Sequence, residues 1–79
     1  MRVPRDLSGS DLIKRLAVLE YEVTRQTGSH VRLRTQRNGE HNITVPAHDP
    51  IKIGTLNSIL RDVAVHFQIT RDQLLERLF

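Results

Sequence analysis

Residues 21–45, YEVTRQTGSHVRLRTQRNGEHNITV, contain three short stretches in which apolar and polar side chains alternate. These stretches are residues 21–26, 30–35 and 42–45, and such alternation is typical of strands with one buried face. Gly28 separates the first two stretches, and Asn38-Gly39, a strong turn signal, separates the second pair. The sequence therefore predicts a three-stranded antiparallel sheet with one face against a core and the other open to solvent.

Apolar residues on both sides of this segment recur at helical spacing. Before it, Ser8 is a candidate N-cap with Asp11 three residues on, and the first helix should end near Glu20. After it, a long helix should begin at Gly54-Thr55. The apolar residues that follow recur at intervals of three and four, which places them on one face of a helix. These apolar residues are Leu56, Ile59, Leu60, Val63, Ala64 and Phe67.

A second capping box, Thr70 with Gln73, predicts a short last helix that buries three leucines through Leu78. The element order is then helix, three strands, helix and short helix. This order gives an α+β fold in which the helices pack on the apolar face of the sheet. We expect residues 1–79 to form a single domain.

The core face must be shared between paired strands, which constrains the register. A three-residue loop, Thr27-Gly28-Ser29, would place Gln26 opposite His30 and keep the apolar residues on one face. In the second hairpin, Leu33 opposite Val45 is one pairing that keeps the apolar residues of both strands on the core face. It would place His30 roughly opposite His48, so that both imidazoles lie at the same end of the sheet.

The amino-acid composition excludes several kinds of site and argues against a membrane protein. The absence of cysteine excludes disulfides and thiolate metal sites, and no apolar stretch has the length of a membrane span. We therefore expect a soluble, cytoplasmic protein. Residues 1–37 hold eight Lys/Arg against four Asp/Glu, whereas residues 38–79 hold four against five. This asymmetry favours a polyanionic partner on one face, although a solvated basic face would look the same.

His30 is the leading candidate for chemistry. Histidine side chains commonly act as general acids and bases, so this one can take a proton from a ribose 2′-hydroxyl or give one to a departing oxygen. Arg32 and Arg34 follow at alternate positions of the same strand, and they would hold phosphate oxygens beside it. A histidine that is merely exposed on a solvated strand fits the same spacing.

Three further basic residues, Arg25, Arg37 and Lys52, could extend these arginines into an RNA-binding surface. A basic face that only aids solubility fits equally well. Recognition by stacking on single-stranded bases is not expected, because the aromatic residues fit core positions. They are Tyr21, Phe67 and Phe79.

We expect no metal and no small-molecule cofactor. A metal site would have to be drawn from residues whose spacing matches no familiar ligand set, and the chain has no glycine-rich phosphate loop. Those residues are His30, His41, His48, His66 and Asp49. His66 falls late in the predicted long helix, where a histidine meets the helix dipole favourably, so a structural role is expected there. His41 should lie at the start of a strand.

Four stretches together resemble the HicA family of toxins, small mRNA interferases of bacterial toxin–antitoxin pairs. The resemblance covers nearly the whole chain. It depends on the order and spacing of the four stretches, because no single stretch is decisive. The stretches are Leu7-Ser8-Gly9 leading into Leu12-Ile13-Lys14, Arg25-Gln26-Thr27-Gly28-Ser29-His30, Thr44-Val45-Pro46-Ala47-His48, and Gly54-Thr55-Leu56-Asn57-Ser58-Ile59-Leu60.

The resemblance implies a fold like that of a double-stranded-RNA-binding domain. It also implies metal-independent RNA cleavage by the histidine of the Gly-Ser-His motif, which is His30 here, with Gly28 and Ser29 as its loop. Apart from the resemblance, the position of His48 makes it a possible second acid or base, or a residue that merely fixes the strand end. The implied partners are mRNA and a HicB-type antitoxin that covers this face. One departure is Glu20, where relatives often carry glycine, and it concerns the helix-to-strand turn.

Two competing functions remain open. A non-catalytic RNA-binding module would bind RNA through the basic face with strong salt dependence but produce no new ends. A protein-interaction domain would show no RNA affinity at physiological salt.

Overall fold

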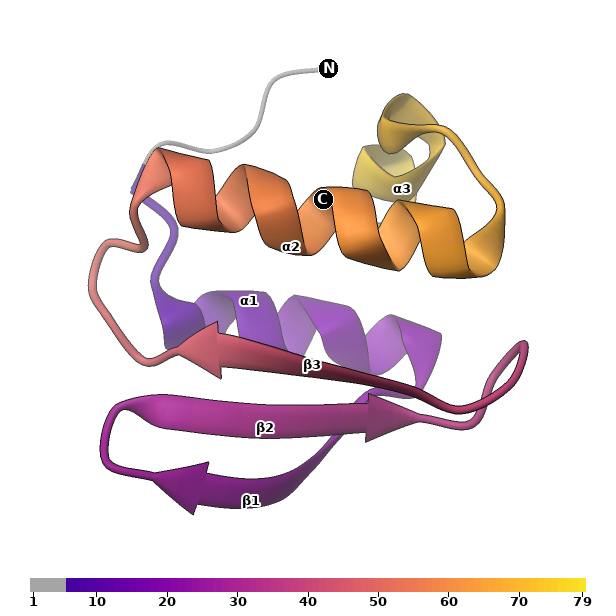
Figure 1. Cartoon of the computed structure of the whole chain (residues 1–79). Helices are drawn as coiled ribbons and strands as arrows, with labels where there is room; N and C mark the ends of the chain where they lie inside the picture. The colour runs from indigo at the N-terminus through magenta and orange to yellow at the C-terminus, as the bar shows by residue number, and fades with distance from the viewer. Residues whose placement is uncertain (1–5) are drawn as a thin grey trace.

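The computed structural model describes residues 6–79, and its elements follow the expected order (Figure 1). Helix α1 and a short 3-10 turn, η1, precede three strands, and two helices follow them. The bounds are α1 Gly9–Leu16, η1 Ala17–Leu19, β1 Glu22–Thr27, β2 His30–Thr35, β3 His41–Pro46, α2 Ile53–Phe67 and α3 Arg71–Leu78. The predicted α+β fold is confirmed, and it is compatible with the arrangement of a double-stranded-RNA-binding domain.

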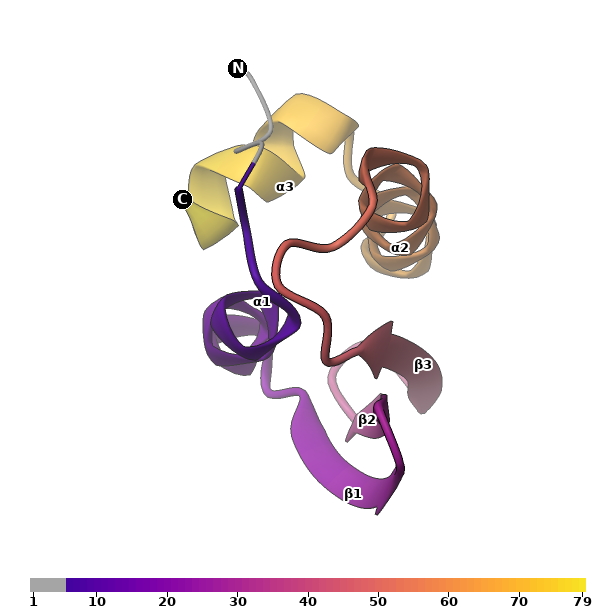
Figure 2. The same ribbon diagram turned by 90° about the vertical axis from the view of Figure 1, so that its left-hand side faces the viewer.

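The three strands form one antiparallel sheet in the order β1-β2-β3, and the helices lie on one side of it (Figure 2). Along β2, Val31, Leu33 and Thr35 are buried, whereas the residues between them are exposed. The core lies between this face and the apolar stripes of the helices, and it holds most of the chain's leucine. None of the helices within residues 6–79 has the length and apolar character needed to cross a bilayer.

Local sequence signals set the helix boundaries. The Ser8 hydroxyl accepts a hydrogen bond from the Asp11 N–H at 3.0 Å, which caps α1. Thr70 and Gln73 form the predicted capping box, with bonds of 3.1 and 2.9 Å. Helix α2 buries five of the six residues of the predicted stripe, and Phe67 packs partly buried against the same core.

The first hairpin differs from the predicted register. Its turn has two residues, Gly28 and Ser29, so that Thr27 rather than Gln26 pairs with His30. The apolar residues return to the same face further along, where β1 carries an extra residue between Val23 and Arg25. This β-bulge at position 24 lets Val23 face Leu33 despite the short turn. The apolar residues of the two strands therefore share one face, as predicted. The extra residue that this requires lies in the strand and not in the loop.

Val23 lies on the helix side of the sheet, as expected, yet it is 53% exposed. The reason is that β1 is an edge strand and α1 does not cover it fully. A shallow hollow of about 340 Å³ remains there, lined by residues that include Ile13, Val23 and Gln26.

The second hairpin is longer than the Asn38-Gly39 signal suggested. Thr35 pairs with His41, so five residues form the loop, and Leu33 faces Ile43 instead of Val45. His30 is consequently opposite Pro46, not His48. His41 begins β3, as expected, and Pro46 ends it, a position where a strand tolerates a missing N–H.

Glu20 ends η1 in the left-handed region, with φ of +65°. A side chain in this conformation costs about 1 kcal/mol, which explains why a glycine suits the position. The Glu20 carboxylate is paired with Arg37 at 3.7 Å, but both side chains are exposed, so the pair contributes little.

We predict that Glu20→Gly raises the free energy of unfolding by about 1 kcal/mol, measured by urea denaturation. Glu20→Ala removes the same ion pair but keeps the strained backbone, so it serves as the control. A glycine variant no more stable than the alanine variant would contradict the account.

Candidate functional site

The open face of the sheet carries the residues singled out for chemistry. His30, Arg32 and Arg34 project from alternate positions of β2, and all three are exposed. Two hollows in this face share His30 as a lining residue. His30 therefore lies at the junction of two places where a ligand could rest.

The larger hollow, of about 370 Å³, lies between the end of the sheet and the start of α2. Its lining combines two imidazoles, one ammonium group and two hydroxyls with a proline: His30, Thr44, Pro46, His48, Lys52 and Thr55. Lys52 is the N-cap residue of α2 and Thr55 lies in its first turn, whose N–H groups carry the positive end of the helix dipole. The His48 imidazole shares this hollow with His30 even though the two residues are not cross-strand partners.

The smaller hollow, of about 160 Å³, lies over the first hairpin and is lined by Arg25, Thr27, His30, Arg32 and Thr44. The two-residue turn brings Arg25 here, because the pairing that starts with Thr27 opposite His30 places Arg25 opposite Arg32. The bulge lies beyond Arg25 along β1. Without it, Leu33 would face Thr24 instead of Val23.

Backbone hydrogen bonds hold together the two segments that carry these imidazoles. The Ala47 N–H donates to the Ser29 carbonyl at 2.6 Å, which joins the neighbours of His48 and His30 directly. The His48 carbonyl accepts from the Gly9 N–H at 2.8 Å, at the first turn of α1. The segment that carries His48 is thus tied both to the hairpin and to a helix.

Gly9 is needed for this close approach. A Cβ at this position would overlap the Pro46 carbonyl oxygen and lie 2.9 Å from the Ala47 Cα, and both are backbone atoms that cannot rotate away. We predict that Gly9→Ala lowers the free energy of unfolding by about 2 kcal/mol, measured by urea denaturation.

Gly54 provides the matched control, since it also lies in the first turn of a helix but a Cβ there meets no atom within 4 Å. Gly54→Ala should be neutral or slightly stabilising. Equal effects of the two alanine variants would show that helix propensity, and not the contact with the His48 segment, decides the cost.

The other basic residues of interest are spread along the sheet. Arg34 lies on the open face opposite Glu22, two positions beyond Arg32. Arg37 lies in the loop between β2 and β3, where it pairs with Glu20, and it lines neither hollow. The structure therefore brings Arg25, Arg32 and Lys52 together with His30, and it leaves Arg37 at the far end of the sheet.

The two loop residues before His30 have clear structural roles. Gly28 adopts a φ of +58°, as a two-residue hairpin favours, and nothing crowds its α-carbon. Ser29 supplies the carbonyl that accepts from Ala47.

The remaining two histidines form a separate cluster at the opposite end of β3. His41 bonds the Tyr21 hydroxyl through Nδ1 at 2.7 Å and the Asp62 carboxylate through Nε2 at 3.2 Å. Its ring stacks on that of His66 at a centroid distance of 4.4 Å. Burial first, and then the charge of Asp62, raise the pKa of the Tyr21 hydroxyl. The bond to Asp62 and the stacking on His66 both join β3 to α2, so this cluster fastens the strand to the helix.

His66 contributes to the same fastening. Its Nε2–H donates to the Arg37 carbonyl at 2.9 Å, and its own carbonyl accepts from the Asn38 side chain at the same distance. The loop between β2 and β3 is therefore held on the last turn of α2. Within residues 6–79, no three His, Asp or Glu side chains gather in a metal-binding arrangement.

Two hydroxyl residues at the site were not singled out from the sequence. Thr44 follows from the alternation of β3, because it is two positions from Pro46 and faces Arg32 across the strands. Thr55 has no such signal, since its place depends on where the first turn of α2 packs.

Comparison with known families assigns most of the chain to one family. Residues 9–65, from the first turn of α1 nearly to the end of α2, match the family described as the HicA toxin of bacterial toxin–antitoxin systems. No curated protein and no solved structure gives a significant match to the chain. Since the family match covers well over half of the sequence, including every residue that lines the two hollows, this chain belongs to the HicA family of toxins.

Proposed function

We propose that this toxin is an mRNA interferase that cuts the RNA backbone by acid–base catalysis at His30. The observation that carries the proposal is the position of His30 at the junction of two hollows on the open face, one also holding His48 and Lys52, the other Arg25 and Arg32. An imidazole beside several cations suits a reaction at a phosphodiester.

The reaction begins with attack of a ribose 2′-oxygen on the adjacent phosphorus. The new P–O2′ bond forms as the P–O5′ bond breaks, which leaves a 2′,3′-cyclic phosphate and a 5′-hydroxyl. One imidazole takes the proton of the 2′-hydroxyl, and the other gives a proton to the departing O5′. His30 and His48 line the same hollow and can divide these two tasks between them.

The surrounding cations are free to hold the phosphate. No carboxylate of residues 6–79 forms an ion pair with Arg25, Arg32 or Lys52. Unpaired guanidinium and ammonium groups bind phosphate oxygens strongly, and they offset the charge that develops on phosphorus. These three residues flank His30 on both sides, so an RNA strand would cross the open face from one hollow to the other.

We predict that Arg32→Gln weakens RNA binding about fivefold at low salt and lowers the slope of log K against log salt by about 0.7. Binding is measured by fluorescence anisotropy in the His30→Ala background, which keeps the RNA intact. Arg77→Gln removes one exposed charge from α3 and is the control, with less than a twofold effect. Equal losses in the two variants would mean that net charge alone attracts the RNA.

The direct test of the function is incubation of the purified protein with end-labelled RNA. New RNA ends support the interferase. Salt-dependent binding without new ends would identify a non-catalytic RNA-binding module instead. Absence of both at physiological salt would leave only a protein-interaction role.

A further inference from the structure

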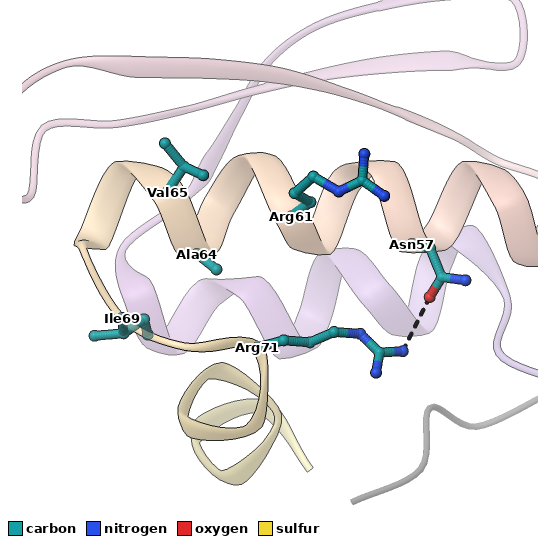
Figure 3. Close-up of a pocket in the computed structure, with 6 residues that line it drawn as sticks. All are labelled: Asn57, Arg61, Ala64, Val65, Ile69 and Arg71. Carbon is teal, nitrogen blue, oxygen red and sulfur yellow. Dashed lines mark hydrogen bonds between the residues drawn. The ribbon is translucent and has the colours of Figure 1, made fainter.

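A further hollow lies away from the proposed catalytic face. It holds about 580 Å³ against α2 and α3 and shares no lining residue with the two hollows around His30. We name it the α2–α3 groove, and its lining is Asn57, Arg61, Ala64, Val65, Ile69 and Arg71 (Figure 3). The function proposed above makes no use of it.

Arg61 and Arg71, the two cations of the groove, have no carboxylate partner within residues 6–79. The Arg71 guanidinium donates to the Asn57 side-chain oxygen at 3.1 Å, and this amide carries no charge. The carboxylate next to Arg61, that of Asp62, is turned to His41 on β3.

The floor of the groove is apolar. Ala64, Val65 and Ile69 contribute aliphatic surface, and Val65 is 70% exposed, the highest value among the large hydrophobic side chains of residues 6–79. Figure 3 shows Arg71 extended beside α2 towards Asn57, while Arg61 projects from the other flank of the helix. Two cations thus border a strip of aliphatic side chains.

This combination fits a polypeptide better than RNA. An aliphatic strip gives a phosphodiester backbone nothing to bind, and no aromatic side chain lines the groove for a base to stack on. In a polypeptide segment that carries both carboxylates and aliphatic side chains, the carboxylates can pair with the two arginines and the aliphatic side chains can pack on the apolar floor.

We infer that the α2–α3 groove binds an acidic, aliphatic segment of a partner protein. Membership of a toxin–antitoxin family makes the antitoxin the first protein in which to look for such a segment. A partner held here would remain attached without touching the RNA-binding face, because the two surfaces share no residue. The inference does not depend on catalysis by His30.

The test is an NMR titration of the full chain, labelled with ¹⁵N and carrying His30→Ala. The probes are the blocked peptide Ac-ELLEELLE-NH₂, the same peptide with glutamine for every glutamate, and decauridylate RNA. We expect the acidic peptide to shift the amides of residues 57–71 with a dissociation constant of about 1 mM. The glutamine peptide should bind at least tenfold more weakly, and the RNA should shift the open face of the sheet.

Three substitutions sharpen the result. Arg61→Gln and Arg71→Gln should each weaken the acidic peptide about fivefold, whereas Arg77→Gln, with the same change in charge, should have less than a twofold effect. Thermal unfolding confirms that each variant is folded. The inference is overturned if the peptide shifts residues outside the groove or does not bind, if the three variants behave alike, or if RNA takes the groove. Because peptide binding is read from amide shifts, a failed cleavage assay would leave this result intact.

Discussion

His30→Ala should lower the rate of RNA cleavage by about 10³-fold or more while leaving the fold unchanged. The exposed imidazole makes no hydrogen bond within residues 6–79, so its removal leaves no buried group without a partner. The loss in rate is the ordinary contribution of a general acid or base. Single-turnover kinetics on labelled RNA measures the rate, and circular dichroism checks the fold.

His66→Gln is the matched control, since it removes a histidine from the fastening cluster instead of the open face. It should unfold at a lower temperature, because the bond to the Arg37 carbonyl is weakened. Below that temperature it should cut RNA at the normal rate. A cleavage rate for His30→Ala within threefold of the unmodified protein would remove His30 from the mechanism.

His48→Ala should slow cleavage about 10²-fold and remove one limb of the bell-shaped pH–rate profile. The imidazole shares the larger hollow with His30, and a water molecule can replace it only poorly as proton donor or acceptor. The substitution leaves the segment in place, because Gly9 and Ser29 hold it through backbone atoms alone. The measurement is kcat/KM from pH 5 to 9.

The shape of that profile separates two roles for His48. If the residue only shapes the loop after β3, both limbs persist and the rate changes by less than about threefold. If it transfers a proton, the remaining limb belongs to His30 and its direction shows which of the two is the base. His48→Gln, which keeps a hydrogen-bonding side chain without a titrating group, should give the same single limb.

The helices could be predicted from the sequence in detail, because their signals are local. Ser8 and Thr70 each cap a helix with a bond to a residue three positions on, and the stripe from Leu56 to Phe67 needs only helical spacing. The alternation along β2 likewise gave the faces of His30 and Arg32 correctly. Neither kind of signal depends on knowing the rest of the fold.

The strand register could not be predicted, because it is decided by irregular features with no marked sequence signature. The extra residue in β1, Thr24, is an ordinary strand residue, and the Asn38-Gly39 pair lies inside a five-residue loop instead of forming the whole turn. His48 reaches the hollow of His30 by another route, the contact of Gly9 with the segment after β3. Thr55 could be placed only once the packing of α2 was known.

The measurement that tests the central claim most directly is the chemistry of the RNA ends left by the purified protein in the presence of EDTA. Attack by the ribose 2′-oxygen under imidazole catalysis predicts undiminished cleavage with 2′,3′-cyclic phosphate and 5′-hydroxyl ends, detected by mass spectrometry. Ends bearing a 3′-hydroxyl and a 5′-phosphate, or activity that EDTA abolishes and a divalent metal restores, would contradict it.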